Sequence, residues 1–190
     1  MAKSATQVLS APVRAIEWGT EIIIAISASL FVALCARFTA WLPTPVPVTL
    51  QNFGVLLVGM VLGRKRGFAA LVLYLAEGAM GLPVFNPLGL GGIAQILGPT
   101  GGYLMAYPFV AYLAGLIMER GEKTFLRGLT AVFLAEILLF VGGLSWLYAF
   151  THSMTLAMKY GLYWFVIAEV LKIASAAGIV SGWRRFSVTR

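Results

Sequence analysis

The sequence predicts an all-α integral membrane protein, a bundle of six transmembrane helices with both termini in the cytoplasm. Three observations predict this fold class. Hydrophobic residues make up 60% of the 190 residues and charged residues only 11%, whereas soluble domains carry about 25% charged residues. Six apolar runs divide the chain, with no sign of a second domain in residues 1–190. Basic residues gather at alternate ends of those runs, as the positive-inside rule requires.

The predicted spans follow the apolar runs in chain order. Lipid offers backbone N–H and C=O groups no water partner, so each run should form a helix. A helix that crosses the hydrocarbon core needs about 20 residues. The six predicted spans cover residues 21–41, 51–62, 67–82, 101–118, 128–150 and 160–183.

The second and third spans are short, and proline and glycine crowd the segments beside them. Pro43, Pro45 and Pro47 precede the second span, and eight proline and glycine residues lie between 81 and 99. Such residues stop regular helix, yet apolar residues continue through both segments. Irregular backbone at membrane depth is tolerated where protein buries it or where it lines a cavity. We therefore expect both loops to fold inward around a cavity.

The basic residues predict the orientation of the bundle. Numbering the flanks alternately places 11 Lys and Arg on one side of the membrane and only Lys159 on the other, with Arg37 and Lys172 inside spans. The side with the positive excess faces the cytoplasm, so both termini should lie there. The net charge of +7 then reports membrane orientation, and no nucleic-acid partner is expected.

Charged residues inside spans are the first candidates for function, because each costs about 2.5–3.5 kcal/mol at a helix centre. Glu169 and Lys172 share one face of the last span. They form either a self-neutralising ion pair or a polar patch at the floor of an outward-facing cavity. Glu77 either lines that cavity or stabilises a helix end. For Glu136 we expect a structural role or a contact with a partner. The Arg37 side chain should extend to the lipid headgroups.

Signatures of catalysis and metal binding are missing from the sequence. His152 is the only histidine and Cys35 the only cysteine, which is too few for a metal site. There is no nucleophile motif and no P-loop, so the chain cannot use ATP by itself. We expect no enzyme activity, no catalytic residue, no bound metal and no cofactor.

Small residues recur every four positions in the first span, at Ala25, Ser29 and Ala33. Such a stripe lets two helices approach closely. It could serve packing within the bundle or the docking of another membrane protein.

Three strings of residues resemble one family. Residues 45–51 read PVPVTLQ and are followed by NFG, residues 81–85 read GLPVF, and residues 98–104 read GPTGGYL. In this order and spacing they closely resemble the BioY family, the biotin-specific substrate-binding (S) components of energy-coupling factor (ECF) transporters. The resemblance runs from the first span through the sixth.

The resemblance implies a six-helix S-component fold in the cytoplasmic membrane of a prokaryote. It implies that the first outer loop is a lid over biotin. It also implies that the stripe of Ala25, Ser29 and Ala33 docks a transmembrane coupling (T) subunit, which two cytosolic ATPase subunits drive. The chain would then contact membrane lipid and capture biotin, while its partners supply the energy.

The resemblance also implies candidate contacts with biotin. An acid and a lysine three residues apart on the last span match Glu169 and Lys172, although the family more often has aspartate after Pro-Gly. Leu104 stands where some members have arginine. The ligand's carboxylate needs a cation, its ureido ring needs donors and acceptors, and its remaining atoms need apolar walls. The predicted ligand-binding residues are Lys172, Glu169, Asn86, Thr49, Gln51, Tyr103 and Glu77.

Two other functions remain open from the sequence. The same fold could bind another vitamin, such as thiamine or riboflavin. Alternatively, the chain could be a non-transport membrane protein, either an enzyme or an assembly scaffold. The missing catalytic residues disfavour an enzyme, and the inward loops with midplane charges disfavour a scaffold.

Replacing Lys172 tests the assignment on the last span. If Lys172 pairs with the carboxylate of biotin, Lys172→Ala should weaken binding strongly, because the ligand loses its charge partner. Calorimetric titration of the purified protein in detergent measures this. An unchanged dissociation constant would mean that Lys172 and Glu169 only neutralise each other.

Overall fold

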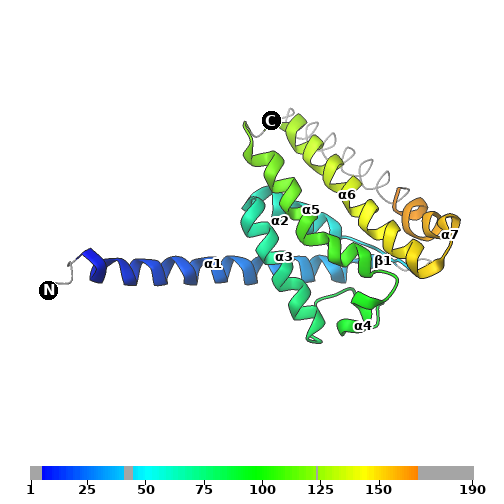
Figure 1. Ribbon diagram of the computed structural model, residues 1–190, viewed down its shortest axis with the longest axis horizontal. Helices are drawn as coiled ribbons and strands as arrows, with labels where there is room; N and C mark the ends of the chain where they lie inside the picture. The colour runs from blue at the N-terminus through cyan, green and yellow to red at the C-terminus, as the bar shows by residue number, and fades with distance from the viewer. Residues whose placement is uncertain (1–5, 41–44, 123, 167–190) are drawn as a thin grey trace, which may run out of the picture.

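A long first helix crosses the bundle and projects far beyond it (Figure 1). The computed structural model describes residues 6–40, 45–122 and 124–166. In it α1 spans Thr6–Arg37, rather than the predicted 21–41. At about 1.5 Å per residue, its 32 residues extend about 48 Å, well over a hydrocarbon core of about 30 Å. The helix ends four residues early because the Thr39 hydroxyl donates to Ala36 O at 2.6 Å and the chain turns into a strand.

The structure contains a two-stranded ribbon, which the all-α prediction did not include. Strand β1 (Thr39–Ala40) pairs antiparallel with β2 (Val48–Thr49), Thr39 opposite Thr49 and Ala40 opposite Val48. Pro45 and Pro47 favour extended backbone, because the ring fixes φ near −65°. Val46 and Val48 are buried, so this first outer segment packs onto the bundle.

Helices α2 and α3 are joined by a single glycine. Helix α2 occupies Gln51–Leu62, as predicted, but α3 spans Arg64–Ala79 instead of 67–82. Gly63 has φ +82°, a conformation that glycine adopts without strain, and it reverses the chain between the helices. Glu119 then accepts a hydrogen bond from Arg64 N at 2.8 Å and pairs with the Arg64 guanidinium at 3.2 Å. The three basic residues at 64–66 therefore form the first turn of α3.

Helix α5 (Gly101–Glu119) is the centre of the bundle, packed against α2, α3 and α6 (Phe125–Thr151). These two helices match the predictions 101–118 and 128–150 closely. Small residues allow the close approach. A Cβ at Gly59 of α2 would lie 2.3 Å from Ala111 O of α5, and one at Gly102 would lie 2.2 Å from the Trp146 Cβ of α6. The backbones of three helices thus nearly touch.

Short helical elements close the end of the bundle that carries the ribbon (Figure 1). Helix α4 (Gly92–Leu97) lies inside the loop that the sequence predicts as irregular. After α6, only His152 and Ser153 separate it from α7 (Met154–Met158), which continues as the π-helix η1 (Lys159–Tyr163). The last helical segment therefore begins before residue 160, and the predicted span 160–183 lies mostly outside the described residues.

Three described segments are long and apolar enough to cross a membrane: Trp18–Arg37, Gly101–Glu119 and Phe125–Thr151. Helix α2 is apolar but shorter. The count of six spans and the orientation of the termini stay predictions.

The contact between α2 and α5 can be tested with a matched pair of glycines. Gly59→Ala should lower the free energy of unfolding by about 1–3 kcal/mol, because the new methyl group meets the Ala111 backbone. Gly128→Ala on α6 has open space around its Cβ and should be neutral or stabilising by up to about 1 kcal/mol. Thermal unfolding in detergent measures both. Equal melting temperatures for the two variants would contradict the close contact.

Candidate ligand-binding site

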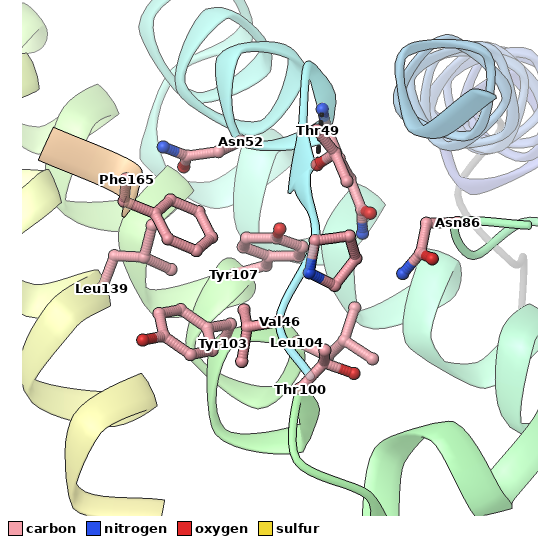
Figure 2. A pocket seen from close by; sticks show the side chains of 12 residues that line it. Val46, Thr49, Asn52, Asn86, Thr100, Tyr103, Leu104, Tyr107, Leu139 and Phe165 are labelled. Carbon is pink, nitrogen blue, oxygen red and sulfur yellow. Dashed lines mark hydrogen bonds between the residues drawn. The ribbon is translucent and has the colours of Figure 1, made fainter. Parts of the chain in front are cut away.

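A small cavity lies where the ribbon, the start of α2, the start of α5 and Phe165 meet (Figure 2). Its volume is about 30 Å³. None of the described residues around it is charged. They are Val46, Pro47, Thr49, Gln51, Asn52, Asn86, Thr100, Tyr103, Leu104, Tyr107, Leu139 and Phe165.

One wall of the cavity is aromatic. The rings of Tyr103 and Phe165 stack with centroids 5.6 Å apart and planes 5° from parallel. The Tyr103 hydroxyl donates to Gly161 O at 2.8 Å, which ties α5 to η1. Tyr103 needs the glycine opposite it, because a Cβ at Gly143 would lie 2.2 Å from its ring. These contacts hold two flat apolar surfaces in place.

Two amide side chains at the start of α2 also line the cavity, and each has one polar atom without a hydrogen-bond partner among the described residues. Asn52 Nδ2 donates to Glu136 Oε1 at 2.5 Å. Its Oδ1, and the Nε2 of neighbouring Gln51, are buried with no hydrogen-bond partner among the described residues. A buried polar group without a partner costs about 1–3 kcal/mol, so native proteins keep few of them. A polar ligand that offers both an acceptor and a donor could satisfy these two atoms.

Asn86 reaches the cavity from the loop after α3, which two hydrogen bonds fix in place. The Tyr74 hydroxyl donates to Val84 O at 2.8 Å, and the Arg37 guanidinium donates to Pro83 O. The Phe85 ring packs edge-on against Tyr74, with centroids 5.4 Å apart. Asn86 Oδ1 then accepts from Leu88 N at 3.2 Å, which directs the backbone into the turn that follows.

A second cavity of about 140 Å³ adjoins the first and shares Pro47, Asn86 and Thr100 with it. The proline- and glycine-rich loop and α4 form its other side. Gln95 borders it, with its Oε1 accepting from Gly91 N at 3.1 Å and its Nε2 buried without a described partner. Residues of both proline- and glycine-rich loops therefore line cavities, in agreement with the predicted inward folding.

The first cavity is too small to hold a vitamin. A volume near 30 Å³ holds about two water molecules, whereas ligand pockets measure about 300–1,000 Å³. A vitamin-sized ligand therefore needs more space than the cavity offers in this conformation. The ribbon and the loop around Asn86 line the cavity and lie outside the central helices.

The structure gathers four of the predicted ligand-binding residues around this cavity: Thr49, Gln51, Asn86 and Tyr103. Glu77 lies elsewhere, between α1 and α3, where it accepts a hydrogen bond from the Ser29 hydroxyl. Glu169 and Lys172 lie outside the described residues. Whether any of these residues binds a ligand stays a prediction.

The stripe of small residues on α1 faces inward. Ser29 is fully buried, and Ala33 is nearly so. The stripe therefore packs within the bundle. This is one of the two roles that its spacing allows, the other being the docking of another membrane protein. Its role in docking a coupling subunit stays a prediction.

Sequence reasoning missed Asn52, Thr100, Tyr107 and Phe165 as lining residues. Asn52 could have been found from the sequence, because it follows Gln51 directly and the two amides are the first residues of an otherwise apolar helix. Glu136 was assigned a structural or partner contact, and it contacts Asn52 across the bundle. For Tyr107 and Phe165 no sequence signal distinguishes them from ordinary core aromatics.

The fold, with three described segments apolar and long enough to cross a membrane, defines a mostly helical membrane protein. The BioY family model matches residues 5–188, and the chain belongs to the BioY family. A relative from Thermotoga maritima named biotin transporter BioY is 36% identical over 176 residues, covering 87% of this chain and 98% of the relative. A Pyrococcus horikoshii protein named probable biotin transporter BioY is 41% identical over 132 residues, 70% of this chain and 76% of its own length.

A solved structure shares the fold. It is a crystal structure of the S-component for biotin from an ECF-type ABC transporter, and it superposes with a TM-score of 0.70 at 25% sequence identity. The match covers 97% of this chain and 95% of that chain. The mostly helical S-component fold expected from the sequence is thereby confirmed.

Removing one hydroxyl tests whether the loop before Asn86 is held as described. Tyr74→Phe leaves Val84 O without its donor and should lower the free energy of unfolding by about 1–3 kcal/mol. Tyr112→Phe is the matched control, because Tyr112 is partly exposed and its ring packs against Phe68 in either form. Thermal unfolding compares the two. A control as destabilised as Tyr74→Phe would contradict the assignment.

Proposed function

We propose that this chain is a biotin-binding S component of an ECF-type transporter and serves biotin uptake. Its membership of the BioY family supports the proposal, as do relatives named biotin transporters and a solved S component for biotin with the same fold. The cavity beside the aromatic wall, which four of the predicted ligand-binding residues line, is the proposed position of the ligand.

The observation that carries the proposal is the pair of unpartnered polar atoms at the cavity. Gln51 Nε2 is a donor and Asn52 Oδ1 is an acceptor, and neither has a partner among the described residues. The ureido ring of biotin has a strong acceptor oxygen and two N–H donors, so it can satisfy both kinds of group. The aromatic rings of Tyr103 and Phe165 suit the sulfur ring and the valeryl chain.

The carboxylate of biotin needs a different partner. No described residue of the cavity lining carries a positive charge, and an unpaired carboxylate is costly to bury. Lys172, with Glu169 keeping it charged, is our proposed partner from the last span. Thr49, Asn86 and Tyr103 complete the proposed contacts. Glu77 does not line the cavity and accepts a hydrogen bond from the Ser29 hydroxyl instead.

The proposed transport assembly follows from the S-component assignment. The chain forms one domain of six spans with both termini in the cytoplasm, in the cytoplasmic membrane of a prokaryote. A transmembrane T subunit and two cytosolic ATPases supply the energy, because this chain has no P-loop. The ribbon segment with Pro45 and Pro47 acts as the lid that opens for the ligand.

Binding to a panel of vitamins tests the proposal. Calorimetric titration of the detergent-purified protein with biotin should show tight binding of one ligand per chain. Thiamine and riboflavin should not compete. A folded sample that binds none of the three would overturn the proposal, and tight binding of thiamine or riboflavin would replace biotin as the substrate.

Reconstitution distinguishes a transporter from a scaffold. With a T subunit, two ATPases and ATP, proteoliposomes that contain this chain should accumulate labelled biotin. Vesicles with the coupling subunits but without this chain are the control. Binding without accumulation in the complete assembly would contradict a role in uptake.

A further inference from the structure

An acidic residue from across the bundle fixes the orientation of one cavity amide. Asn52 is 5% exposed, and its Nδ2 donates to Glu136 Oε1 at 2.5 Å, joining the start of α2 to the middle of α6. A carboxylate accepts hydrogen bonds and cannot donate them. The amide must therefore turn its NH₂ group toward Glu136, and its oxygen points the other way.

The oxygen that results is a fixed acceptor at the cavity. Asn52 lines the cavity, and its Oδ1 has no described hydrogen-bond partner. Figure 2 shows the Asn52 amide above the ring of Phe165, at the opposite side of the site from Asn86. A buried acceptor in this position is satisfied by a ligand that carries an N–H or O–H group.

We propose that Asn52 Oδ1 accepts a hydrogen bond from one ureido N–H of the ligand, and that Glu136 is the positioning residue that makes the site select this donor. This inference rests on the proposed function. The ligand class that it defines is cyclic ureas with a free N–H. An analogue with a methyl group on that nitrogen loses the bond and leaves Oδ1 buried without a partner, so the site rejects it.

Ligand analogues test the contact directly. Binding of biotin is compared with binding of the two derivatives that carry a single methyl group on one ureido nitrogen. In the wild-type protein, at least one derivative should bind about a hundredfold more weakly than biotin. Asn52→Leu keeps the branched shape of the side chain but removes the acceptor, together with the donor to Glu136. It should weaken biotin binding by about tenfold or more and reduce the preference over that derivative by a similar factor.

If Asn52→Leu fails to fold, exchanging the amide and the carboxylate between positions 52 and 136 tests the same contact. Asn52→Asp places two carboxylates together, and Glu136→Gln frees the Asn52 amide to turn over. Each should weaken biotin binding by about tenfold or more. In the double variant the new amide on α6 donates to the new carboxylate on α2, which still offers an oxygen to the ligand at unchanged net charge. Binding should then recover to within about threefold of wild type, a coupling that a double-mutant cycle measures.

Glu119→Gln is the matched control, because Glu119 bonds to the start of α3 far from the cavity. It should lower thermal stability without changing the preference for biotin over the methylated derivative. If Asn52→Leu also leaves that preference unchanged, or if the double variant binds no better than the singles, Asn52 and Glu136 are structural and the inference is wrong. A wild-type protein that binds no biotin would instead overturn the proposed function.

Discussion

Buried polar groups must find partners inside the protein, and this constraint shapes the end of the bundle that carries the ribbon. Bulk water cannot satisfy a buried N–H or C=O group. The loop after α3 meets the constraint with side chains from two helices, since Arg37 binds Pro83 O and Tyr74 binds Val84 O. The buried carbonyl of Val84 is therefore satisfied although the loop is irregular, whereas the bond to Pro83 O lies at the exposed surface.

The same constraint makes the exceptions informative. Gln51 Nε2, Asn52 Oδ1 and Gln95 Nε2 are buried without described partners, and their side chains line the two adjoining cavities. The one other such side-chain atom among the described residues is Arg127 Nη1, which lies at the start of α6 and lines neither cavity. Unsatisfied groups gathered at one place are a stability cost that a bound ligand would remove. The site is thus defined by what the protein leaves unpaired.

The central helices and the segments outside them contribute different sides of the cavity. Helix α5 is packed so closely against α2 and α6 that Gly59 and Gly102 leave no room for a methyl group. Tyr103 and Tyr107 on this helix therefore present a fixed wall. The ribbon and the loop around Asn86 lie outside the central helices and form the other side of a cavity of about 30 Å³.

Much of the fold follows from local sequence. Apolar runs predicted α2, α5 and α6 closely, because the length of a membrane helix is set by the run itself. The predicted ends of α1 and α3 were wrong. The C-terminal end of α1 depends on the turn at Thr39. The start of α3 depends on Glu119, which is distant in the sequence and accepts a hydrogen bond from Arg64 N. Of the candidate site, motif residues such as Gln51, Asn86 and Tyr103 could be named in advance, although their binding role stays a prediction.

The sequence by itself determined a helical membrane protein whose proline- and glycine-rich loops fold inward, and its motifs pointed to the BioY family. Only the tertiary structure decided which polar atoms are paired. Glu77 turned to Ser29 in the helix interface, whereas Glu136 reached Asn52 across 84 residues of chain. The physical reason is that hydropathy depends on residue type alone. A hydrogen bond depends on two atoms meeting, and only the packing of α2 against α5 and α6 brings them together.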